Sequence, residues 1–430
     1  MTGLVDAALA ILLALIWNAF IVSRIHANFS RDEARFLSQT YTATLLLRYC
    51  LACFLNAYAV DYSFTMTFWG DSGTYDDFGY MIAQIWSGDG VIGPGIGAMH
   101  SFAYVVGAVY YVFGRNQLLV QFLNGTLGGL AVVVIYAIAR ELFDAQVARW
   151  AALFMAFFPQ MIFWSAAMYK DPAVILAIAT CMYALLKLRS AFGVAHLVMF
   201  ITSLLTLMFL RFYIFYFVAF ATIGTFIFAQ QRRALASILA QLTLVGAFLT
   251  AFSFVADREV VNQQTQYFDL EKVQTSRMDL ARSGRSGFAT QADVSTPMGA
   301  LTVLPTGFLY LMFAPFPWAA IGIRQVLTVP ETLVWYALMP ALVRGLLYAV
   351  RQRLRASLPI LVFAVSLTLA YAVFQGNVGT AYRQRTQISM FYFIFIGVGL
   401  VEKQRRLSAR VPSNLPPLAA RRAVTGPSLR

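Results

Sequence analysis

Charged residues and cysteine are scarce in this chain of 430 residues. Only 12% of the residues are charged and 60% are apolar, and the mean hydropathy is +0.69, whereas charged residues make up about 25% of a soluble globular domain. The 3 cysteines cannot form a disulfide framework. Cys50 and Cys53 lie one helical turn apart in an apolar run without the further ligands that a zinc site needs. The composition predicts an integral membrane protein, because each crossing uses about 20 apolar residues.

The balance of charge is basic, with 32 lysines and arginines against 19 acidic residues. In a soluble protein this excess would suggest a nucleic-acid partner. Here the cations fall in alternate loops between hydrophobic runs, as the positive-inside rule describes. The sequence has no phosphate-cradling nucleotide loop and no internal repeat of the kind found in many transporters. We therefore expect contacts with membrane lipids and no nucleic-acid partner.

The hydrophobic runs predict an all-α polytopic bundle of about eleven transmembrane helices. Residues 3–23 have no basic residue before them and several after, which predicts a retained first span with its N-terminus outside. The alternating basic loops then place the C-terminus inside. The further spans are predicted at about 41–62, 117–139, 149–168, 172–189, 193–210, 212–229, 237–255, 331–350, 357–375 and 387–401.

Two other apolar segments are predicted to lie at the external interface. If residues 98–114 crossed alone, every later basic loop would change sides, so we interpret them as an interfacial helix. Residues 303–322 contain three prolines, so this segment is interpreted as interfacial or re-entrant. The predicted division is an N-terminal span and connection at 1–40, a membrane module at 41–255 with interfacial helices at about 72–114, an external loop and interfacial segment at 256–330, C-terminal spans at 331–401, and a basic disordered cytoplasmic tail at 402–430.

Two acidic sites share the predicted external face. Asp71 follows a span and begins an amphipathic stretch, although capping of that helix would also explain an aspartate there. Lys170 and Asp171 form a short turn before Pro172, and initiation of the next helix is the alternative account. Carboxylates and a lysine on one face are suited to general-base chemistry and to binding an anion.

A basic cluster is predicted on the same face between the last two spans. Tyr382, Arg383 and Arg385 follow two glycines, and paired guanidinium donors can bind phosphate oxygens. Arg211 is also external in this topology. The alternative is an ordinary solvated basic loop. Together the clusters predict an external pocket for a lipid carrier whose phosphate is held by cations while its tail stays in the bilayer.

Two arginines fall inside predicted spans. Arg48 and Arg344 lie near the cytoplasmic ends of their runs, so both are predicted to snorkel to the interface. A transporter or flippase for a lipid-linked substrate is a non-enzymatic alternative. The lack of an acidic partner for these arginines and of repeat symmetry weighs against it.

The order of these motifs resembles the GT-C superfamily of polytopic glycosyltransferases, which includes protein O-mannosyltransferases and the lipid A aminoarabinose transferase. The resemblance covers about residues 41–190. It rests on Asp71-Ser-Gly-Thr-Tyr75 after a span, Val112-Phe-Gly114 at the end of a second interfacial segment, Ala139-Arg-Glu-Leu-Phe143 at the end of a span, and Lys170-Asp171 after an outward span.

The resemblance implies that Asp71 is the catalytic aspartate acting as general base and that Asp171 is the second external acidic residue, so both are predicted to be catalytic. It also implies an inverting transfer from a polyprenyl phosphate or diphosphate. Lys170 would help to hold the carrier phosphate. Arg383 and Arg385 are added from their local chemistry. Tyr75, His100, Arg211 and Tyr382 complete the predicted substrate-binding set.

The predicted function is transfer of a sugar from a polyprenyl-phosphate donor to a saccharide, lipid or protein acceptor. A polysaccharide polymerase or ligase that uses a polyprenyl diphosphate-linked oligosaccharide is the alternative within the same chemistry. No cofactor is predicted, no metal ligand is assigned, and a requirement for a divalent metal is left open. The expected location is the bacterial inner membrane with the site on the periplasmic side.

Overall fold

The structure, a computed structural model, describes residues 2–58, 71–90, 101–228, 246, 269–283, 286–319 and 323–410. Within these ranges every regular element is a helix, which confirms the predicted all-α class. The helices are α1 Thr2–Asn28, α2 Arg31–Tyr58, α4 Asp71–Ser87, α5 Ser101–Phe113, α6 Gln117–Leu142, α7 Ala145–Phe157, α8 Pro159–Ala166, α9 Asp171–Ser190, α10 Val194–Arg211, α11 Tyr213–Phe228, α14 Leu270–Ser283, α15 Pro297–Phe313, the 3₁₀ helix η3 Pro317–Ala319, α16 Ile323–Gln352, α17 Leu354–Phe374 and α18 Val378–Arg410.

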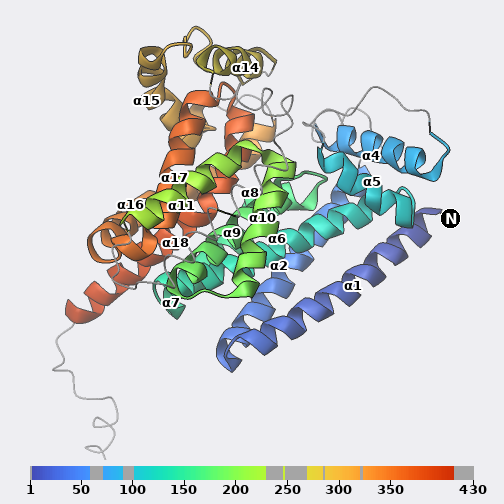
Figure 1. Cartoon of the computed structure of the whole chain (residues 1–430), viewed down its shortest axis with the longest axis horizontal. Coiled ribbons are helices and arrows are strands. Elements are labelled where there is room, and N and C mark those ends of the chain that lie inside the picture. Colours follow the sequence, from blue (N-terminus) through green and yellow to red (C-terminus); the bar gives the residue numbers. More distant parts are fainter. Residues whose placement is uncertain are drawn as a thin grey trace, which may run out of the picture.

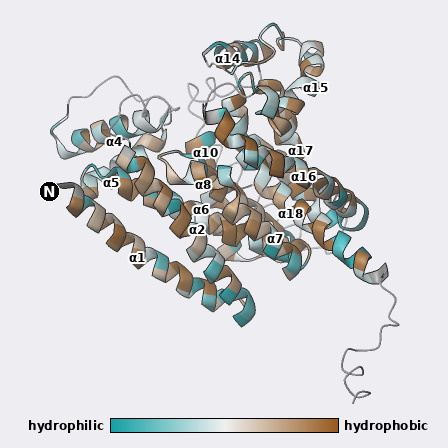
Figure 2. Ribbon diagram, turned by 180° about the vertical axis from the view of Figure 1, so that it is seen from behind, coloured by the Kyte–Doolittle hydropathy of each residue, from teal (hydrophilic) through white to brown (hydrophobic). Residues whose placement is uncertain are grey.

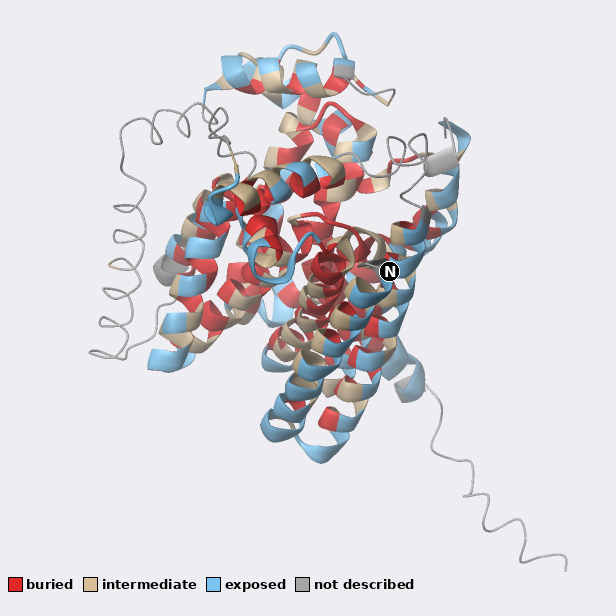
Figure 3. Ribbon diagram, turned by 90° about the vertical axis from the view of Figure 1, so that its right-hand side faces the viewer, coloured by how far each residue is buried: buried red, intermediate tan, exposed pale blue. Residues whose placement is uncertain are grey.

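The long helices form one bundle with different elements at its two ends. The N-terminus, α4, α5 and α14 lie toward one end, and α18 runs out at the other (Figure 1). Hydrophobic residues predominate along the bundle helices (Figure 2). Buried residues follow the centre of the bundle, while the outward faces of α1 and other peripheral helices are exposed (Figure 3). Large apolar side chains exposed on such helices are what a surrounding bilayer would cover.

The span count is lower than predicted among the described residues. Six helices are long and apolar enough to cross a membrane, or seven if the bent pair α7–α8 forms one crossing. Three shorter apolar helices, Ser101–Phe113, Tyr213–Thr225 and Pro297–Phe313, fall below that length. The run at 237–255 lies almost entirely outside the described residues. The fold is thus that of an integral membrane protein, and the count of eleven stays a prediction.

Ion pairs connect the helix turns at the end of the bundle opposite α4. At the α4 end, the Asn116 side chain donates to the backbone oxygen of Asp6 at 2.8 Å, which fixes the start of α1 there. The described basic turns at Arg140, Lys187 and Arg405 therefore lie at one end of the bundle, and the start of α1 lies at the other. The far-end pairs are Arg140–Glu33 at 2.8 Å, Lys187–Glu141 at 2.5 Å and Arg405–Asp144 at 2.7 Å.

The N-terminal helix α1 is attached to the bundle by a polar network. Trp17 Nε1 donates to Thr126 Oγ1 at 2.8 Å. The Asn18 amide donates to the Tyr49 hydroxyl at 2.8 Å and accepts from the Tyr41 hydroxyl at 2.5 Å. These bonds join α1 to α2 and α6.

The predicted run 149–168 is not one continuous helix. Phe158 is extended, and Pro159 begins α8 at an angle of 51° to α7. The prediction that Arg48 snorkels is wrong, because its side chain is fully buried beside this break. It donates to Ser165 Oγ at 2.8 Å and to the backbone oxygen of Ala156 at 3.1 Å. Arg48 thus supplies donors at the point where a proline interrupts the helical hydrogen bonds.

The segment 98–114 is described from residue 101, and that part forms α5, which packs beside α4 away from the main bundle (Figure 1). Buried Asp76 of α4 accepts from the Tyr110 hydroxyl at 2.5 Å and from Gln117 Nε2 at 2.7 Å, and it also pairs with Arg115. This network holds the two helices together. Their placement in the external interface remains a prediction.

The described part of 303–322 comprises the second half of α15 and η3. Pro305 lies inside α15, and the helix ends at Phe313. Gly307 approaches α17 so closely that a Cβ atom would lie 1.7 Å from the Ala372 carbonyl oxygen. Only glycine fits this contact, which fixes α15 against α17 above the last two helices of the bundle.

Candidate active site

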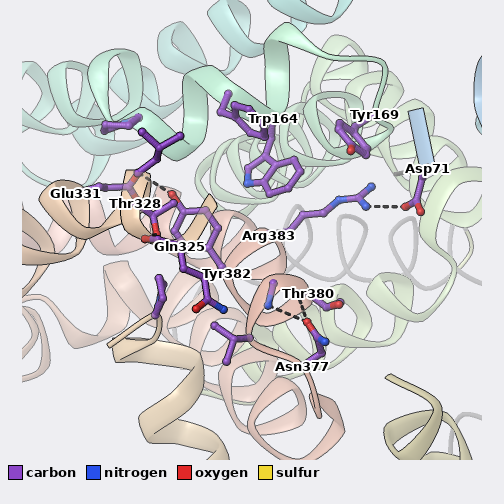
Figure 4. Close-up of a pocket in the computed structure, with 16 residues that line it drawn as sticks. Asp71, Trp164, Tyr169, Gln325, Thr328, Glu331, Asn377, Thr380, Tyr382 and Arg383 are labelled. Carbon is purple, nitrogen blue, oxygen red and sulfur yellow. Dashed lines mark hydrogen bonds and ion pairs between the residues drawn. The ribbon is translucent and has the colours of Figure 1, made fainter. Parts of the chain in front are cut away.

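A cavity of about 430 Å³ lies between the start of α4, α8, the beginning of α16 and the beginning of α18 (Figure 4). Its size falls within the range of about 300–1,000 Å³ that is typical of small-molecule sites. Phe163, Trp164 and Tyr169 form an aromatic wall. Asp71 lies at one end of the cavity and Glu331 at the other (Figure 4).

Arg383 joins two carboxylates that are far apart in the sequence. Its Nη1 lies 2.6 Å from Asp71 Oδ2, and its Nη2 lies 2.6 Å from Asp171 Oδ2. The guanidinium also lies over the rings of Tyr169 and Trp164, at 4.3 and 5.5 Å from their centroids. A planar guanidinium offers several donors and a flat face, which suits it to this bridging position. The structure thus brings together one residue from each of the three predicted clusters.

The two carboxylates differ in accessibility. The side chain of Asp71 is 59% exposed, whereas that of Asp171 is fully buried. Asp171 also forms an ion pair through Oδ1 with Arg211 Nη2 at 3.4 Å. A buried carboxylate between two cations is held in place as part of a charge network. Asp71 can be reached from the cavity, and Asp171 serves to position Arg383 and Arg211.

A buried amide fixes the turn that carries Lys170. Asn124 Nδ2 donates to the backbone oxygens of Ala167 and Tyr169 at 2.8 and 2.9 Å. Burial lowers the pKa of Lys170 to about 8, and the nearby positive charge of Arg211 acts in the same direction. Lys170 therefore loses its charge as the pH rises through about 8.

The remaining predicted site residues differ in whether they line the cavity. Tyr75 is buried in α4 and packs edge-on against Phe102 with ring centroids 5.2 Å apart, and burial raises the pKa of Tyr75 to about 12. Tyr382 lines the cavity beside Arg383. His100 lies outside the described residues.

Contrary to the prediction, Arg385 does not line the cavity. It is fully buried, and its Nη1 donates to the backbone oxygens of Met312 and Ala314 at 3.0 and 3.1 Å. Both arginines lie on α18, where residues two apart point about 200° away from each other. Arg383 therefore faces the carboxylates, whereas Arg385 closes the end of α15.

The sequence analysis missed Glu331. This residue of α16 is buried, lines the cavity and accepts a hydrogen bond from the Tyr382 hydroxyl at 2.7 Å. A signal was present, because Glu331 is an acidic residue at the first position of the predicted run 331–350. Ionisable residues at the edge of the bilayer are costly and merit the same attention as the two arginines that the sequence analysis singled out.

The residues at the cavity do not form a recognisable metal-ligand cluster. Within the described ranges, no group of three or more histidines, cysteines or acidic residues is arranged to hold an ion. The carboxylates of Asp71 and Asp171 are linked by the guanidinium of Arg383 instead.

Comparison with protein families supports the resemblance to the GT-C superfamily. Residues 100–256 match the model of the dolichyl-phosphate-mannose-protein mannosyltransferase family. That segment contains Lys170, Asp171 and Arg211, and it does not contain Asp71 or Arg383. No curated protein sequence matches the chain.

A solved structure of an archaeal oligosaccharyltransferase shares the fold. The Archaeoglobus fulgidus enzyme in complex with an inhibitory peptide and a dolichol-phosphate aligns with 12% sequence identity and a TM-score of 0.51. Its apo crystal structure aligns with 14% identity and a TM-score of 0.48. Each alignment covers 92% of this chain and 54% of the other, so the chain spans about half the length of the oligosaccharyltransferase. The family match and this fold confirm the GT-C resemblance.

Proposed function

We propose that this protein is a GT-C-type membrane glycosyltransferase that transfers a sugar from a polyprenyl-phosphate-linked donor to an acceptor at the external membrane face. The observation that carries the proposal is the linkage of Asp71 and Asp171 through Arg383 at the edge of the cavity. It provides an accessible carboxylate and a fixed cation side by side, which are the two groups that such a transfer requires. The bacterial inner membrane is the proposed location, with the cavity facing the periplasm.

Asp71 is the proposed general base. Its carboxylate lines the cavity and remains exposed, so an acceptor hydroxyl can approach it. As the acceptor oxygen forms a bond to the anomeric carbon, the bond from that carbon to the phosphate oxygen breaks. The hydroxyl proton passes to Asp71, and attack from the face opposite the phosphate inverts the anomeric centre. A positioned base typically contributes about 10²–10⁴-fold to the rate.

The leaving phosphate is the group that the cations stabilise. Arg383 lines the cavity, and the pair with buried Asp171 fixes its guanidinium. Lys170 and Arg211 lie close enough to this cluster to influence its charge. Donors fixed in advance stabilise charge that develops in the transition state without further reorganisation. The lipid tail would stay in the bilayer beside the bundle.

Substitution of Asp71 by asparagine tests this assignment. Purified Asp71→Asn protein in nanodiscs would be incubated with undecaprenyl-phosphate mannose or glucose and with a membrane extract as the source of acceptor. We expect the initial rate of joined product, measured by mass spectrometry, to fall by about 10²–10⁴-fold, with unchanged thermal unfolding.

The matched control is Asp77→Asn on the same helix, since Asp77 is 78% exposed and does not line the cavity. This control should retain the wild-type rate. Wild-type turnover by the Asp71→Asn protein would refute the role of Asp71.

Transfer of an oligosaccharide from a polyprenyl diphosphate is a second candidate, favoured by the fold shared with the archaeal oligosaccharyltransferase. The monophosphate-linked and diphosphate-linked donors differ in the negative charge of the phosphate group. Arg383 is the cavity-lining cation that would interact with this charge. If the diphosphate is the natural carrier, wild-type protein should bind undecaprenyl diphosphate more tightly than the monophosphate, and Arg383→Ala should remove that preference. Arg385 is a poor target for this test, because its contacts are structural.

A further inference from the structure

The end of the cavity opposite Asp71 carries a second polar cluster. Glu331 and Thr328 come from α16, and Tyr382 comes from α18 (Figure 4). The side chain of Glu331 is only 3% exposed. None of these residues belongs to the charge network around Asp171, so this end of the cavity offers a ligand a separate set of polar groups.

One carboxylate oxygen of Glu331 accepts a hydrogen bond within the protein, and the other does not. Oε2 accepts from the Tyr382 hydroxyl at 2.7 Å, whereas Oε1 is buried without a hydrogen-bond partner among the described residues. Arg385 Nη2 forms an ion pair with Oε1 at 4.0 Å, which is beyond hydrogen-bond distance, and the backbone N–H of Gln160 also acts on this carboxylate. A buried carboxylate oxygen without a donor is costly, and a native protein seldom retains one without a reason. A bound ligand that presents a donor would satisfy it.

The surroundings of this oxygen define the kind of donor. The positive charge of Arg385 disfavours a second cation at Oε1, so an ammonium group is a poor fit and a neutral hydroxyl is a good one. The aromatic rings of Phe163, Trp164 and Tyr382 line the same cavity and provide apolar faces. A cavity that combines such faces with a few fixed polar groups is suited to a polyhydroxylated ring.

We propose that Glu331 is a specificity-determining residue that accepts a hydrogen bond from a ring hydroxyl of the transferred sugar, with Tyr382 holding the carboxylate in place. The substrate class is a neutral hexose carried on the lipid phosphate. This inference rests on the proposed glycosyltransferase function and assigns different binding roles to the two ends of the cavity. The end with Arg383 binds the phosphate, and the end with Glu331 binds the sugar and determines which sugar is accepted.

Binding measurements with and without the sugar test this division. Wild-type protein and variants in nanodiscs would be titrated with undecaprenyl phosphate alone and with undecaprenyl-phosphate glucose and mannose. We expect wild-type protein to bind at least one sugar-bearing lipid about 10–100-fold more tightly than the carrier alone, as hydrogen bonds to a charged group allow. In Glu331→Gln, the ratio of affinity for the sugar-bearing lipid to affinity for the carrier alone should fall about tenfold. Its affinity for the carrier alone should stay within about twofold of wild type.

Two further variants make the result independent of folding defects. Tyr382→Phe keeps the ring and removes only the hydroxyl that positions Glu331, so it should lose part of the gain. Glu271→Gln changes an exposed glutamate on α14 and should behave as wild type. An unchanged gain in both Glu331→Gln and Tyr382→Phe would overturn the inference and leave the proposed function intact. Failure of wild-type protein to bind any of the three lipids would overturn both.

Discussion

Arginines in the interior of this protein, buried or half-buried, have different roles, and each role is identified by the partners of the side chain. Arg48 supplies donors to a helix break, Arg383 links two carboxylates at the cavity, and Arg385 closes a helix end. Removal of a buried cation from such a site leaves its partners unsatisfied, which costs more than loss of an exposed charge. Residues of one type therefore differ in function because their neighbours differ.

The pH dependence of carrier binding should report on Lys170, whose pKa burial lowers to about 8. Below this pKa the side chain is charged and, in the proposed mechanism, would attract the lipid phosphate. As the pH rises from 7.5 to 9.5, the free protein loses this charge, so we expect the affinity for undecaprenyl phosphate to fall by about tenfold. Titration of wild-type protein in nanodiscs at a series of pH values would measure this fall.

Lys170→Arg is the matched variant, because its guanidinium stays charged throughout this range. It should keep the affinity nearly constant up to pH 9.5. The same fall in the arginine variant, or a flat profile in wild-type protein, would contradict the role of Lys170.

Interrupted helices position the site at the scale of secondary structure. The break between α7 and α8 turns Phe163 and Trp164 toward the cavity, and α15 ends where Arg385 binds its last carbonyls. A straight crossing at 149–168 would place these aromatic residues differently. The broken backbone is stabilised by buried side-chain donors, since lipid cannot provide them.

Arg48→Met should destabilise this break. The methionine fills part of the volume but donates no hydrogen bond to Ser165 or to the Ala156 carbonyl. We expect the free energy of unfolding to fall by about 1–3 kcal/mol, seen as a lower thermal unfolding temperature, together with weaker carrier binding.

Arg344→Met is the control, because Arg344 is exposed on α16. Its unfolding temperature should match that of wild type. Equal stability of the two variants would show that Arg48 does not hold the break.

The whole molecule has a polar site at one end and a ring of basic turns at the other. Asp71, Asp171 and Arg383 meet at the first end. Glu33 and Asp144 pair with arginines at the second. By the positive-inside rule, we propose that the cavity faces the outside of the cell.

Cysteine labelling measures this orientation. The background has the three native cysteines replaced by alanine. Asp77→Cys lies in α4 and Glu402→Cys lies near the C-terminal end of α18, and these two parts of the chain lie at opposite ends of the bundle (Figure 1). A membrane-impermeant maleimide added to intact spheroplasts should label position 77 and spare position 402. Labelling of position 402 alone would reverse the orientation and refute an external active site.

Much of the architecture follows from local properties of the sequence. Hydropathy and loop charge predict the helices and their grouping by end, because a bilayer demands apolar spans and charge bias sets their direction. Asp71, Asp171 and Arg383 are candidates because the loop charges place their clusters on one predicted external face. The missed helix break at Pro159 and the buried state of Arg48 depend on contacts between helices that no single stretch encodes.

The sequence alone determined a helical membrane protein with a polar face at one end, since composition and periodicity act locally. Only the tertiary structure decided which polar groups meet. It placed Arg383 between two carboxylates and turned Arg385 away, because the two residues lie on opposite sides of a helix that begins at Val378. It also brought Glu331 into the cavity, since packing of α16 against α18 sets the partners of a buried carboxylate.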